Sequence, residues 1–260
     1  MMYLKKLLRP FFKPYFAWRE ARAHIVRNAQ FRAEDQSRVD FYSQFVGKGE
    51  LVFDVGANVG NRVRAFLALD ARVLAIEPQR ACAKILRSSF GAQNGFKLCA
   101  KGVSTAEGEA EIYISNVNTI SSFSEGWIQA VKKSGRFSEF NWSRKQKVEM
   151  TTLDRLIESY GLPSFIKIDV EGFEFEVVGG LSQPVDCVSI EFTPEYFQNT
   201  LNCIMHMDKL HEGNCSYQLS LGESMVFELP EWCDRAGIEK ALNSYRKSSG
   251  LFGDIYIRKG

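Results

Sequence analysis

The stretch Leu51-Val-Phe-Asp-Val-Gly-Ala-Asn-Val-Gly60 decides how the rest of the chain is interpreted. Apolar residues on both sides of an acid, followed by two glycines, are typical of a buried strand that ends in a tight turn into a helix. Gly56 and Gly60 allow the backbone to turn sharply, and they let a ligand approach because no Cβ is present. Asp54 could contact that ligand, or it could only accept hydrogen bonds from backbone amides of the turn.

The spacing of the two glycines argues against a phosphate-binding turn. The dinucleotide fingerprint G-x-G-x-x-G has a middle glycine that makes room for a pyrophosphate. In this chain Asn58 occupies that position, and no Gly-Lys-Ser/Thr sequence of a P-loop follows. A carboxylate at the end of a strand suits a cationic group instead, such as an ammonium or a sulfonium.

The residues after this stretch alternate between strand and helix patterns. Strands are predicted at 51–55, 72–76, 96–100, 165–170 and 185–192, and helices at 59–69, 78–90, 153–160 and 173–180. This order predicts a parallel sheet with helices on both faces. A helix from Pro194 to about His211 precedes three further strands at 216–221, 224–229 and 251–258. We expect the last two strands to pair antiparallel.

Residues 101–150 interrupt the alternation and are predicted to form an insertion or lid. Positions 109–114 and 147–150 look extended, whereas 115–144 is polar and rich in Ser, Asn and aromatic residues. Long loops of this kind tend to be functional. The aromatic rings could stack on a sugar, while five cations could pair with phosphate or carboxylate: Lys132, Lys133, Arg136, Arg144 and Lys145. Alternatively, the rings pack inside a solvated loop.

The first 48 residues are predicted to form a helical extension of a single domain that spans 49–260. Residues 1–38 hold nine Lys and Arg against three acids, and five aromatic residues lie between positions 11 and 18. Residues 1–30 could therefore contact an anionic membrane surface, or pack on the domain as a cap. The prolines at 10 and 14 interrupt an amphipathic helix, and no run of about 18 apolar residues predicts a membrane span.

Composition is that of an ordinary globular protein, with 45% hydrophobic and 25% charged residues. The net charge of +2 gives no case for general nucleic-acid binding. The six cysteines are scattered without a C-x-x-C pair, which favours free thiols in a reducing compartment. No secretory signal is evident. We therefore expect a cytoplasmic protein, with or without peripheral contact to the inner face of the membrane.

A second acid, Glu77, ends the next predicted strand within the sequence Ala75-Ile-Glu-Pro78. It follows the glycine turn by about 20 residues, the separation at which doubly wound folds place an acid on ribose hydroxyls. A carboxylate can accept hydrogen bonds from both hydroxyls at once. Asp54, the two glycines and Glu77 together therefore predict a nucleoside-containing ligand.

The stretch Phe165-Ile-Lys-Ile-Asp-Val-Glu-Gly-Phe-Glu174 carries charges within an apolar strand. Side chains alternate between the faces of a strand, so Lys167, Asp169 and Glu171 share one face. A lysine buried there needs a counterion, because an unpaired buried charge is costly. Its candidate partners are Asp54, Asp169 and Glu191. We expect a structural ion pair for Lys167, and a ligand-site role for the two acids at the carboxyl end of the strand.

The chain resembles the FkbM-type S-adenosylmethionine-dependent methyltransferases. The motifs that carry the resemblance occur in family order over roughly residues 50–195: Phe53-Asp-Val-Gly-Ala-Asn-Val-Gly60, Ala75-Ile-Glu-Pro78, Thr152-Leu-Asp154, Ile166-Lys-Ile-Asp-Val-Glu-Gly172, Gly179-Gly180 and Ser189-Ile-Glu191. The resemblance implies a Rossmann-like, seven-stranded class I methyltransferase sheet, the cofactor S-adenosylmethionine, and transfer to a hydroxyl oxygen. The acceptor is expected to be a sugar, glycan or related secondary metabolite.

The resemblance also implies a cofactor site, made by Asp54, Gly56, Asn58, Gly60, Glu77, Pro78, Gly102 and Asp169. Gly56 and Gly60 would flank the methionine part, Glu77 would bind the ribose, and the turn that begins at Gly102 would lie near the adenine. Asp54 and Asp169 would face the methionine ammonium or the acceptor.

A hydroxyl nucleophile benefits from a base within hydrogen-bond reach. The candidate catalytic residues are Asp169, Glu171 and Glu191, with preference for the first two because they share one strand edge. Acids at the ends of two neighbouring strands could also hold a divalent cation such as magnesium. Because Phe192 and Thr193 follow Glu191, rather than a further acid or amide, we expect no metal.

Two other function classes stay open on the residues alone. A nicotinamide-dependent oxidoreductase shares the sheet and the acid at the end of the second strand, but the glycine spacing and the lack of a Tyr-x-x-x-Lys pair argue against it. A methyltransferase-like domain could also act as a non-catalytic binding module. The retained acids make that less attractive.

Overall fold

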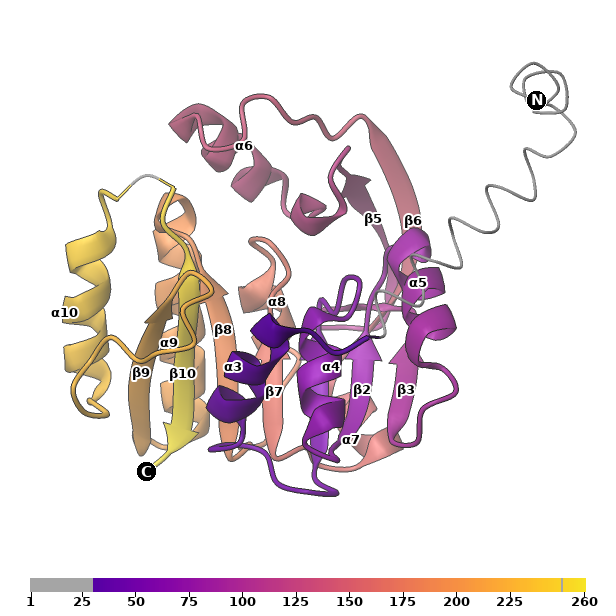
Figure 1. Cartoon of the computed structure of the whole chain (residues 1–260). Coiled ribbons are helices and arrows are strands. Elements are labelled where there is room, and N and C mark those ends of the chain that lie inside the picture. Colours follow the sequence, from indigo (N-terminus) through magenta and orange to yellow (C-terminus); the bar gives the residue numbers. More distant parts are fainter. Residues whose placement is uncertain (1–29, 249) are drawn as a thin grey trace, which may run out of the picture.

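A seven-stranded sheet forms the centre of the chain in the computed structural model, which describes residues 30–248 and 250–260 (Figure 1). In spatial order the strands are β3 (Phe96–Cys99), β2 (Arg72–Ile76), β1 (Leu51–Val55), β7 (Phe165–Ile168), β8 (Cys187–Phe192), β10 (Gly253–Lys259) and β9 (Cys215–Leu221). Neighbours pair parallel up to β8, and β10 runs antiparallel to both β8 and β9. The predicted seven-stranded α/β sheet is confirmed.

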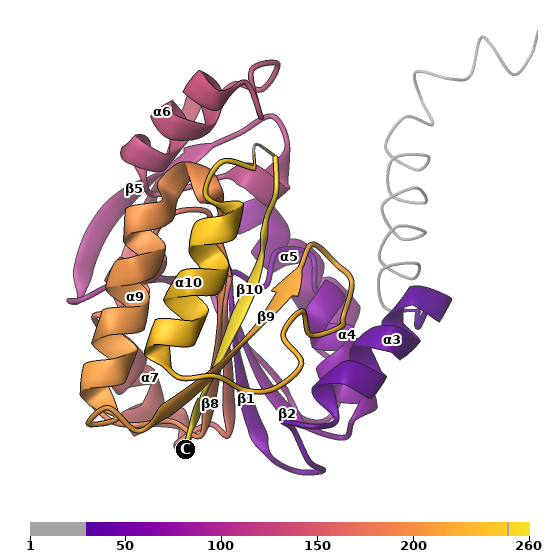
Figure 2. The same ribbon diagram turned by 90° about the vertical axis from the view of Figure 1, so that its left-hand side faces the viewer.

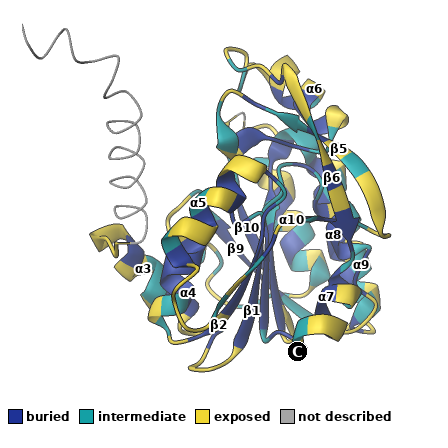
Figure 3. Cartoon of the chain, turned by 90° about the vertical axis from the view of Figure 1, so that its right-hand side faces the viewer, coloured by how far each residue is buried: buried dark blue, intermediate teal, exposed yellow. Residues whose placement is uncertain are grey.

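Helices cover both faces of this sheet, as predicted (Figure 2). One face carries α3 (Ala33–Tyr42), α4 (Asn61–Ala68) and α5 (Arg80–Phe90), and the other carries α7 (Leu153–Tyr160), α8 (Glu174–Val178), α9 (Phe197–Leu210) and α10 (Arg235–Tyr245). Alternation along β1 explains the two cores: Val52 packs into the first and Phe53 into the second. Figure 3 shows buried residues along the strands and on the inward sides of the helices.

Helix α10 was not predicted, although its signals are in the sequence. The side chain of Asp234 caps it by accepting a hydrogen bond from the backbone N of Gly237 at 2.8 Å. Ile238 and Leu242, four residues apart, are fully buried against the sheet. An Asp followed by one apolar pair is a short pattern, and this explains why the helix is hard to detect in the sequence.

The prediction of a strand at 224–229 is wrong. These residues form an irregular segment after the turn that follows β9, and the antiparallel partner of β10 is β9 itself. Met225 adopts a left-handed φ of 52°, which is incompatible with a strand. The preceding Glu223 forms ion pairs with Arg38 and Arg62 at 3.3 and 2.8 Å, and the backbone N of Glu228 donates to the carbonyl of Leu219 in β9 at 2.8 Å. The segment thus contacts both the helical layer and the sheet edge without forming a strand ladder.

Residues 101–150 form a second layer above the carboxyl ends of the strands (Figure 1). Three strands, β4 (Gly102–Val103), β6 (Arg144–Thr151) and β5 (Gly108–Ile114), make a small sheet in this order. The predicted polar loop at 115–144 contains a short 3-10 helix, η1 (Asn118–Ile120), and helix α6 (Glu125–Ser134), which the sequence did not suggest. The insertion therefore has a folded structure of its own.

The aromatic residues of the insertion are mostly internal. Trp127 is fully buried and Trp142 is 9% exposed, in a cluster with Ile120, Ile128 and Val131. Indole Nε1 of Trp142 donates to the carbonyl of Ile120 at 2.7 Å. The sequence left open whether the aromatic rings stack on a sugar or pack inside the insertion. Both tryptophans pack inside it.

Helix α3 belongs to the predicted N-terminal extension, and it packs directly on the sheet. Tyr42 is fully buried, and Asp35 forms a buried ion pair with Arg64 of α4 at 2.9 Å. Predictions for residues 1–29, including membrane contact, lie outside the described residues, and the domain boundary near residue 48 stays a prediction. Within the part of the chain that the structure describes, no helix is long and apolar enough to cross a membrane.

Candidate active site

A cavity of about 400 Å³ lies between the carboxyl ends of the sheet strands and the insertion. At this edge β1 lies between β2 and β7, so the order of the strands along the chain reverses here. Open α/β sheets bind their ligands at such a reversal point. Eight of the predicted site residues line it: Asp54, Gly56, Asn58, Glu77, Pro78, Asp169, Glu171 and Glu191. The volume is in the usual range for a small-molecule site.

Two predicted cofactor residues are not among those that line the cavity. Gly60 has a φ of 94°, and a Cβ there would come within 2.4 Å of the Phe90 ring. A Cβ on Gly102 would lie 2.6 Å from the sulfur of Met150. Gly60 is therefore required by its left-handed backbone and its packing on Phe90, and Gly102 packs against Met150. Neither glycine lines the cavity, although Val59 and Asn61, on either side of Gly60, do.

Gly56 lines the cavity, and its conformation fits the predicted tight turn. Its φ of 85° is left-handed, and a Cβ would lie 1.8 Å from the carbonyl oxygen of Asp169. The group that approaches most closely is thus the backbone after β7 rather than a ligand. This contact brings the loop after β1 and the loop after β7 together at one edge.

Asp54 is 1% exposed, and its Oδ2 has no hydrogen-bond partner among the described residues. Burial raises its pKa to about 6, although attraction to Lys167 and Arg62 opposes this. An unsatisfied buried carboxylate oxygen is costly, so it favours a ligand that donates hydrogen bonds or carries positive charge. A methionine ammonium group has both properties, which is what the cofactor prediction requires.

Glu77, unlike Asp54, accepts hydrogen bonds from backbone amides, which was the alternative role considered for Asp54. Its two oxygens accept hydrogen bonds from the backbone N of Asn58 at 2.8 Å and of Gln79 at 2.7 Å. Burial raises the pKa of Glu77 to about 7, while these amides stabilise its charged form. Each oxygen keeps a lone pair that could accept from a ribose hydroxyl. The position therefore fits the predicted role, and the carboxylate is held before any ligand binds.

Asn58 connects the cofactor loop to the insertion. It has a left-handed φ of 48°, and its Oδ1 accepts a hydrogen bond from Nδ2 of Asn118 at 2.7 Å. Nε2 of Gln79 donates to the carbonyl of Asn118 at 3.0 Å. One asparagine of the insertion therefore contacts both loops that follow β1 and β2.

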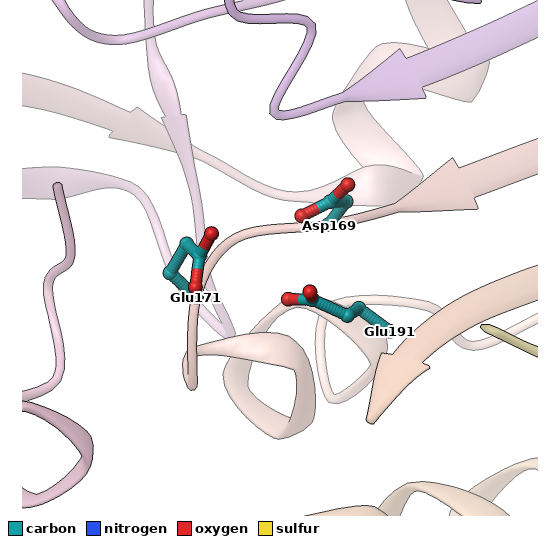
Figure 4. A group of neighbouring side chains, drawn as sticks. All are labelled: Asp169, Glu171 and Glu191. Atoms are coloured by element: carbon teal, nitrogen blue, oxygen red, sulfur yellow. The ribbon is translucent and has the colours of Figure 1, made fainter. Parts of the chain in front are cut away.

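Three carboxylates converge in the cavity wall (Figure 4). Asp169 and Glu171 follow β7, Glu191 lies near the end of β8, and one oxygen of each is within 4.8 Å of the others. Glu171 has a left-handed φ of 56°, and its carbonyl accepts a hydrogen bond from Ser122 of the insertion at 2.6 Å. The structure thus brings together all three predicted catalytic residues.

Lys167 is buried below this group and is paired, as predicted. Its Nζ lies 2.7 Å from Oδ2 of Asp169 and 3.7 Å from Oδ1 of Asp254. Burial disfavours its charge, but the two aspartates outweigh this and raise its pKa. Asp169 was among the candidate partners, whereas Asp254, from β10, was not. Strand order across the sheet, which motif spacing does not reveal, brings it close.

Glu171 and Glu191 have no counterion among the residues that the structure describes. Burial raises the pKa of both, and repulsion among the neighbouring carboxylates, including Asp169, adds to it. Neighbouring carboxyl groups with raised pKa values can share a proton, accept one from a substrate, or bind a cation. Oxygen ligands of this kind are also those that magnesium prefers, so a divalent cation would bind here if anywhere in the cavity.

Sequence reasoning missed several residues of the cavity wall. Arg62 of α4 and Glu223 after β9 form an ion pair at 2.8 Å, and both line the cavity. Phe252 lies next to Arg136, whose side chain is 11% exposed. The sequence had indicated Arg136 only as one of several cations of the insertion. None of these residues is part of a recognisable motif, because they come from four separate segments.

Comparisons with known proteins agree with this architecture. The model of the methyltransferase FkbM domain matches residues 54–224, which is more than half of the chain. A comparison with curated proteins gave no match.

Solved structures with a similar fold include three methyltransferases. Precorrin-6y C5,15-methyltransferase from Geobacter metallireducens is 9% identical, with a TM-score of 0.46 and 86% of each chain covered. A putative methyltransferase from Streptococcus mutans in complex with SAH is 12% identical, with a TM-score of 0.42 over 89% of this chain and 100% of that one. An O-methyltransferase from Thermotoga maritima is 13% identical, with a TM-score of 0.41 over 88% and 66%. These likenesses are too distant to support an argument about the acceptor.

The family match covers both the cofactor loop and the three carboxylates, and the predicted resemblance is confirmed. The chain belongs to the FkbM methyltransferase family, and S-adenosylmethionine is its methyl donor.

Proposed function

We propose that the protein transfers a methyl group from S-adenosylmethionine to a hydroxyl oxygen of a sugar or a related secondary metabolite. The observation that carries this proposal is the group of Asp169, Glu171 and Glu191 in the same cavity wall as Asp54. A hydroxyl is a weak nucleophile, and these carboxylates offer an acceptor for its proton. The acceptor is proposed to be a small molecule or saccharide rather than a nucleic acid.

The proposed roles of the residues divide the cavity in two. Asp54 and Glu77 would hold the ammonium and the ribose of the cofactor. Bound S-adenosylmethionine supplies an electrophilic methyl group on sulfur, so that the carbon–sulfur bond breaks as the oxygen–carbon bond forms and sulfur keeps the electron pair. The chain's main task is then to place the hydroxyl oxygen in line with that bond.

Asp169 is the proposed base. Its side chain is 36% exposed to the cavity, and the ion pair of 2.7 Å with Lys167 fixes its position. The hydroxyl proton would pass to the free oxygen of Asp169 as the oxygen attacks. Glu171 and Glu191, which lie beside it, would contact the acceptor.

The test has a binding arm and a turnover arm. Calorimetric titration should show binding of S-adenosylmethionine and none of NAD, and absence of the former would overturn the proposal. Release of S-adenosylhomocysteine should depend on an added hydroxyl compound. Cofactor binding without release, whatever hydroxyl, amine or thiol compound is added, would favour a non-catalytic binding module instead.

The location of the protein is a separate proposal. Basic residues at positions 1–30 are proposed to contact the inner face of a membrane from the cytoplasm. Deleting 1–30 should abolish co-flotation with vesicles that contain anionic lipid. Equal flotation of the full and shortened chains would contradict it.

A further inference from the structure

The wall of the cavity carries an excess of negative charge. Seven acidic and three basic side chains line it. Each of the three basic side chains already has an acidic partner: Lys167 is paired with Asp169, Arg62 with Glu223, and Arg136 with Glu195. Among the residues that the structure describes, no cationic side chain of the lining is therefore left without an acidic partner to bind a phosphate or a carboxylate of the acceptor.

Arg136 is the only one of these cations that comes from the insertion. Its guanidinium lies 4.9 Å from the ring centre of Phe137 and 5.4 Å from that of Phe252. It also donates to the carbonyl of Leu251 at 3.0 Å. Arg136 thus ties the insertion to the segment before β10. The other cations considered for phosphate binding do not line the cavity: Lys132, Lys133, Arg144 and Lys145.

Four acids of the lining have no cationic partner among the described residues: Asp54, Glu77, Glu171 and Glu191. The backbone amides of Asn58 and Gln79 stabilise Glu77. The buried, unpartnered Oδ2 of Asp54 is accounted for by the cofactor ammonium. Glu171 and Glu191 remain, and a proton or a cation that enters with a ligand would relieve the repulsion between them further than Lys167 and Arg136 do.

We infer that the acceptor carries a protonated amine beside the hydroxyl that is methylated, and that Glu171 and Glu191 bind this ammonium group. The inference rests on the proposed function, since it assigns the substrate class of the same cavity: an amino sugar or an amino alcohol. Asp169, at the third corner of the group, then faces the neighbouring hydroxyl and accepts its proton.

An ammonium group suits this position better than a divalent metal ion. Lys167 lies 2.7 Å from Asp169 and already compensates one of the three carboxylates. The carboxylates attract a divalent ion twice as strongly as a monovalent one, and Lys167 repels it twice as strongly, so charge alone does not separate the two. An ammonium group can in addition donate hydrogen bonds to Glu171 and Glu191, which a metal ion cannot do.

The experiment uses the full chain saturated with S-adenosylhomocysteine and compares matched ligands by calorimetry. Glucosamine should bind roughly tenfold or more tightly than glucose or N-acetylglucosamine, and ethanolamine more tightly than ethylene glycol. The double variant Glu171→Gln, Glu191→Gln should lose the preference for the amines. Glu139→Gln, on the exposed surface of the insertion, is the matched control and should keep it.

Three results would overturn the inference: equal or undetectable binding of the amine and neutral members of each pair, tighter binding of glucose 6-phosphate than of glucosamine, or an amine preference that survives in the double variant. Magnesium chloride titrated alone is the further arm. Magnesium binding that the double variant abolishes would assign the glutamates to a metal instead. If S-adenosylhomocysteine itself fails to bind, the proposed function fails; if it binds and the amines show no preference, only this inference fails.

Discussion

The two halves of the cavity satisfy their carboxylates in different ways. In the cofactor half, Glu77 is held by backbone amides of Gln79, two residues on, and of Asn58, in the loop after the neighbouring strand β1. In the acceptor half, Asp169 is held by a lysine side chain, and Glu171 has no counterion at all among the described residues. Backbone amides are present whatever side chains the loop carries. The cofactor half should therefore tolerate change in its neighbours, whereas the acceptor half depends on individual charges.

The largest expected effect is on turnover, in the variant Asp169→Asn. Removing a general base typically lowers the rate by about 10²–10⁴-fold. Because the cofactor half is unaltered, the affinity for S-adenosylmethionine should change by only a few-fold. Release of S-adenosylhomocysteine and calorimetric titration measure the two quantities in the same preparation.

A loss of cofactor affinity as large as the loss of turnover would break the division between the halves. In that case Asp169 binds the cofactor, which was the other role considered for it. Full turnover in the variant would show that the base lies elsewhere or that none is needed. Glu139→Gln, outside the cavity, serves as the control.

The next effect concerns Asp54→Asn, which should weaken binding of S-adenosylmethionine by about 100-fold, since a buried charge partner of the ammonium is lost. The same change should not lower the melting temperature of the free protein, because it removes a buried carboxylate whose Oδ2 has no partner. Calorimetry and thermal unfolding test the two parts. Asp70→Asn, at an exposed ion pair with Lys48, is a control for both.

Unchanged cofactor affinity in Asp54→Asn would contradict the assignment. A marked loss of stability together with the loss of affinity would show that Asp54 is part of the fold rather than a ligand contact. The two halves differ again here: the same kind of substitution at Asp169 leaves Lys167 without its closest partner and should destabilise the free protein.

The sequence predicted residues within local motifs better than pairings across the sheet: all three acids of the acceptor half line the cavity, whereas Gly60 and Gly102, predicted for the cofactor half, do not. Asp54, Asn58 and Glu77 are fixed by the local pattern of strand, glycine turn and strand, which leaves little choice of position. Lys167 needed a partner, and the sequence supplied Asp169 but not Asp254, because β10 reaches this place only through the order of strands in the sheet. Local patterns predict local geometry, and pairings across the sheet are outside their reach.

The fold follows the same rule. The alternation of strands and helices gave the sheet and both helical layers, whereas the strand at 224–229 was wrong and α6 and α10 were missed. Residues 224–229 have apolar members, yet Glu223 is paired with α3 and α4, and the segment contacts β9 through the hydrogen bond from Glu228 to Leu219 without forming a ladder. Such tertiary contacts override weak strand propensity.

A smaller effect is expected in the pH dependence of cofactor affinity, which reports on Asp54 in the cofactor half. Burial raises the pKa of Asp54 to about 6 from an ordinary value of 3.8. Because the pKa is raised in the folded state, the protonated carboxyl stabilises the free protein fully at a pH below 3.8, and this stabilisation is lost as the pH rises through 6. Binding of the ammonium needs the ionised form, so affinity should fall about tenfold between pH 7 and pH 5.

Above pH 8 the affinity should fall again, because the α-amino group of the cofactor loses its proton. Asp54→Asn should lack the acidic limb of this profile and keep the basic one. An acidic limb that persists in this variant would assign it to Glu77, whose pKa burial raises to about 7. Titrations at several pH values with both proteins decide this.

The smallest effect is expected at the ion pair that joins helix α3 to the cavity wall. Arg38 lies 3.3 Å from Glu223, which is itself held 2.8 Å from Arg62. Because half of the Glu223 side chain is exposed, the outer pair contributes no more than about 1 kcal/mol. Arg38→Ala should therefore weaken cofactor binding less than about twofold and lower stability slightly, since Arg62 still holds Glu223 and Arg64 still holds Asp35, the other partner of Arg38. Lys48→Ala, at an exposed pair outside the cavity, is the matched control. A tenfold loss of affinity in Arg38→Ala alone would mean that α3 positions the cofactor half through side-chain charge. The cofactor half would then depend on charged side chains as the acceptor half does, and the contrast between the two halves would be wrong.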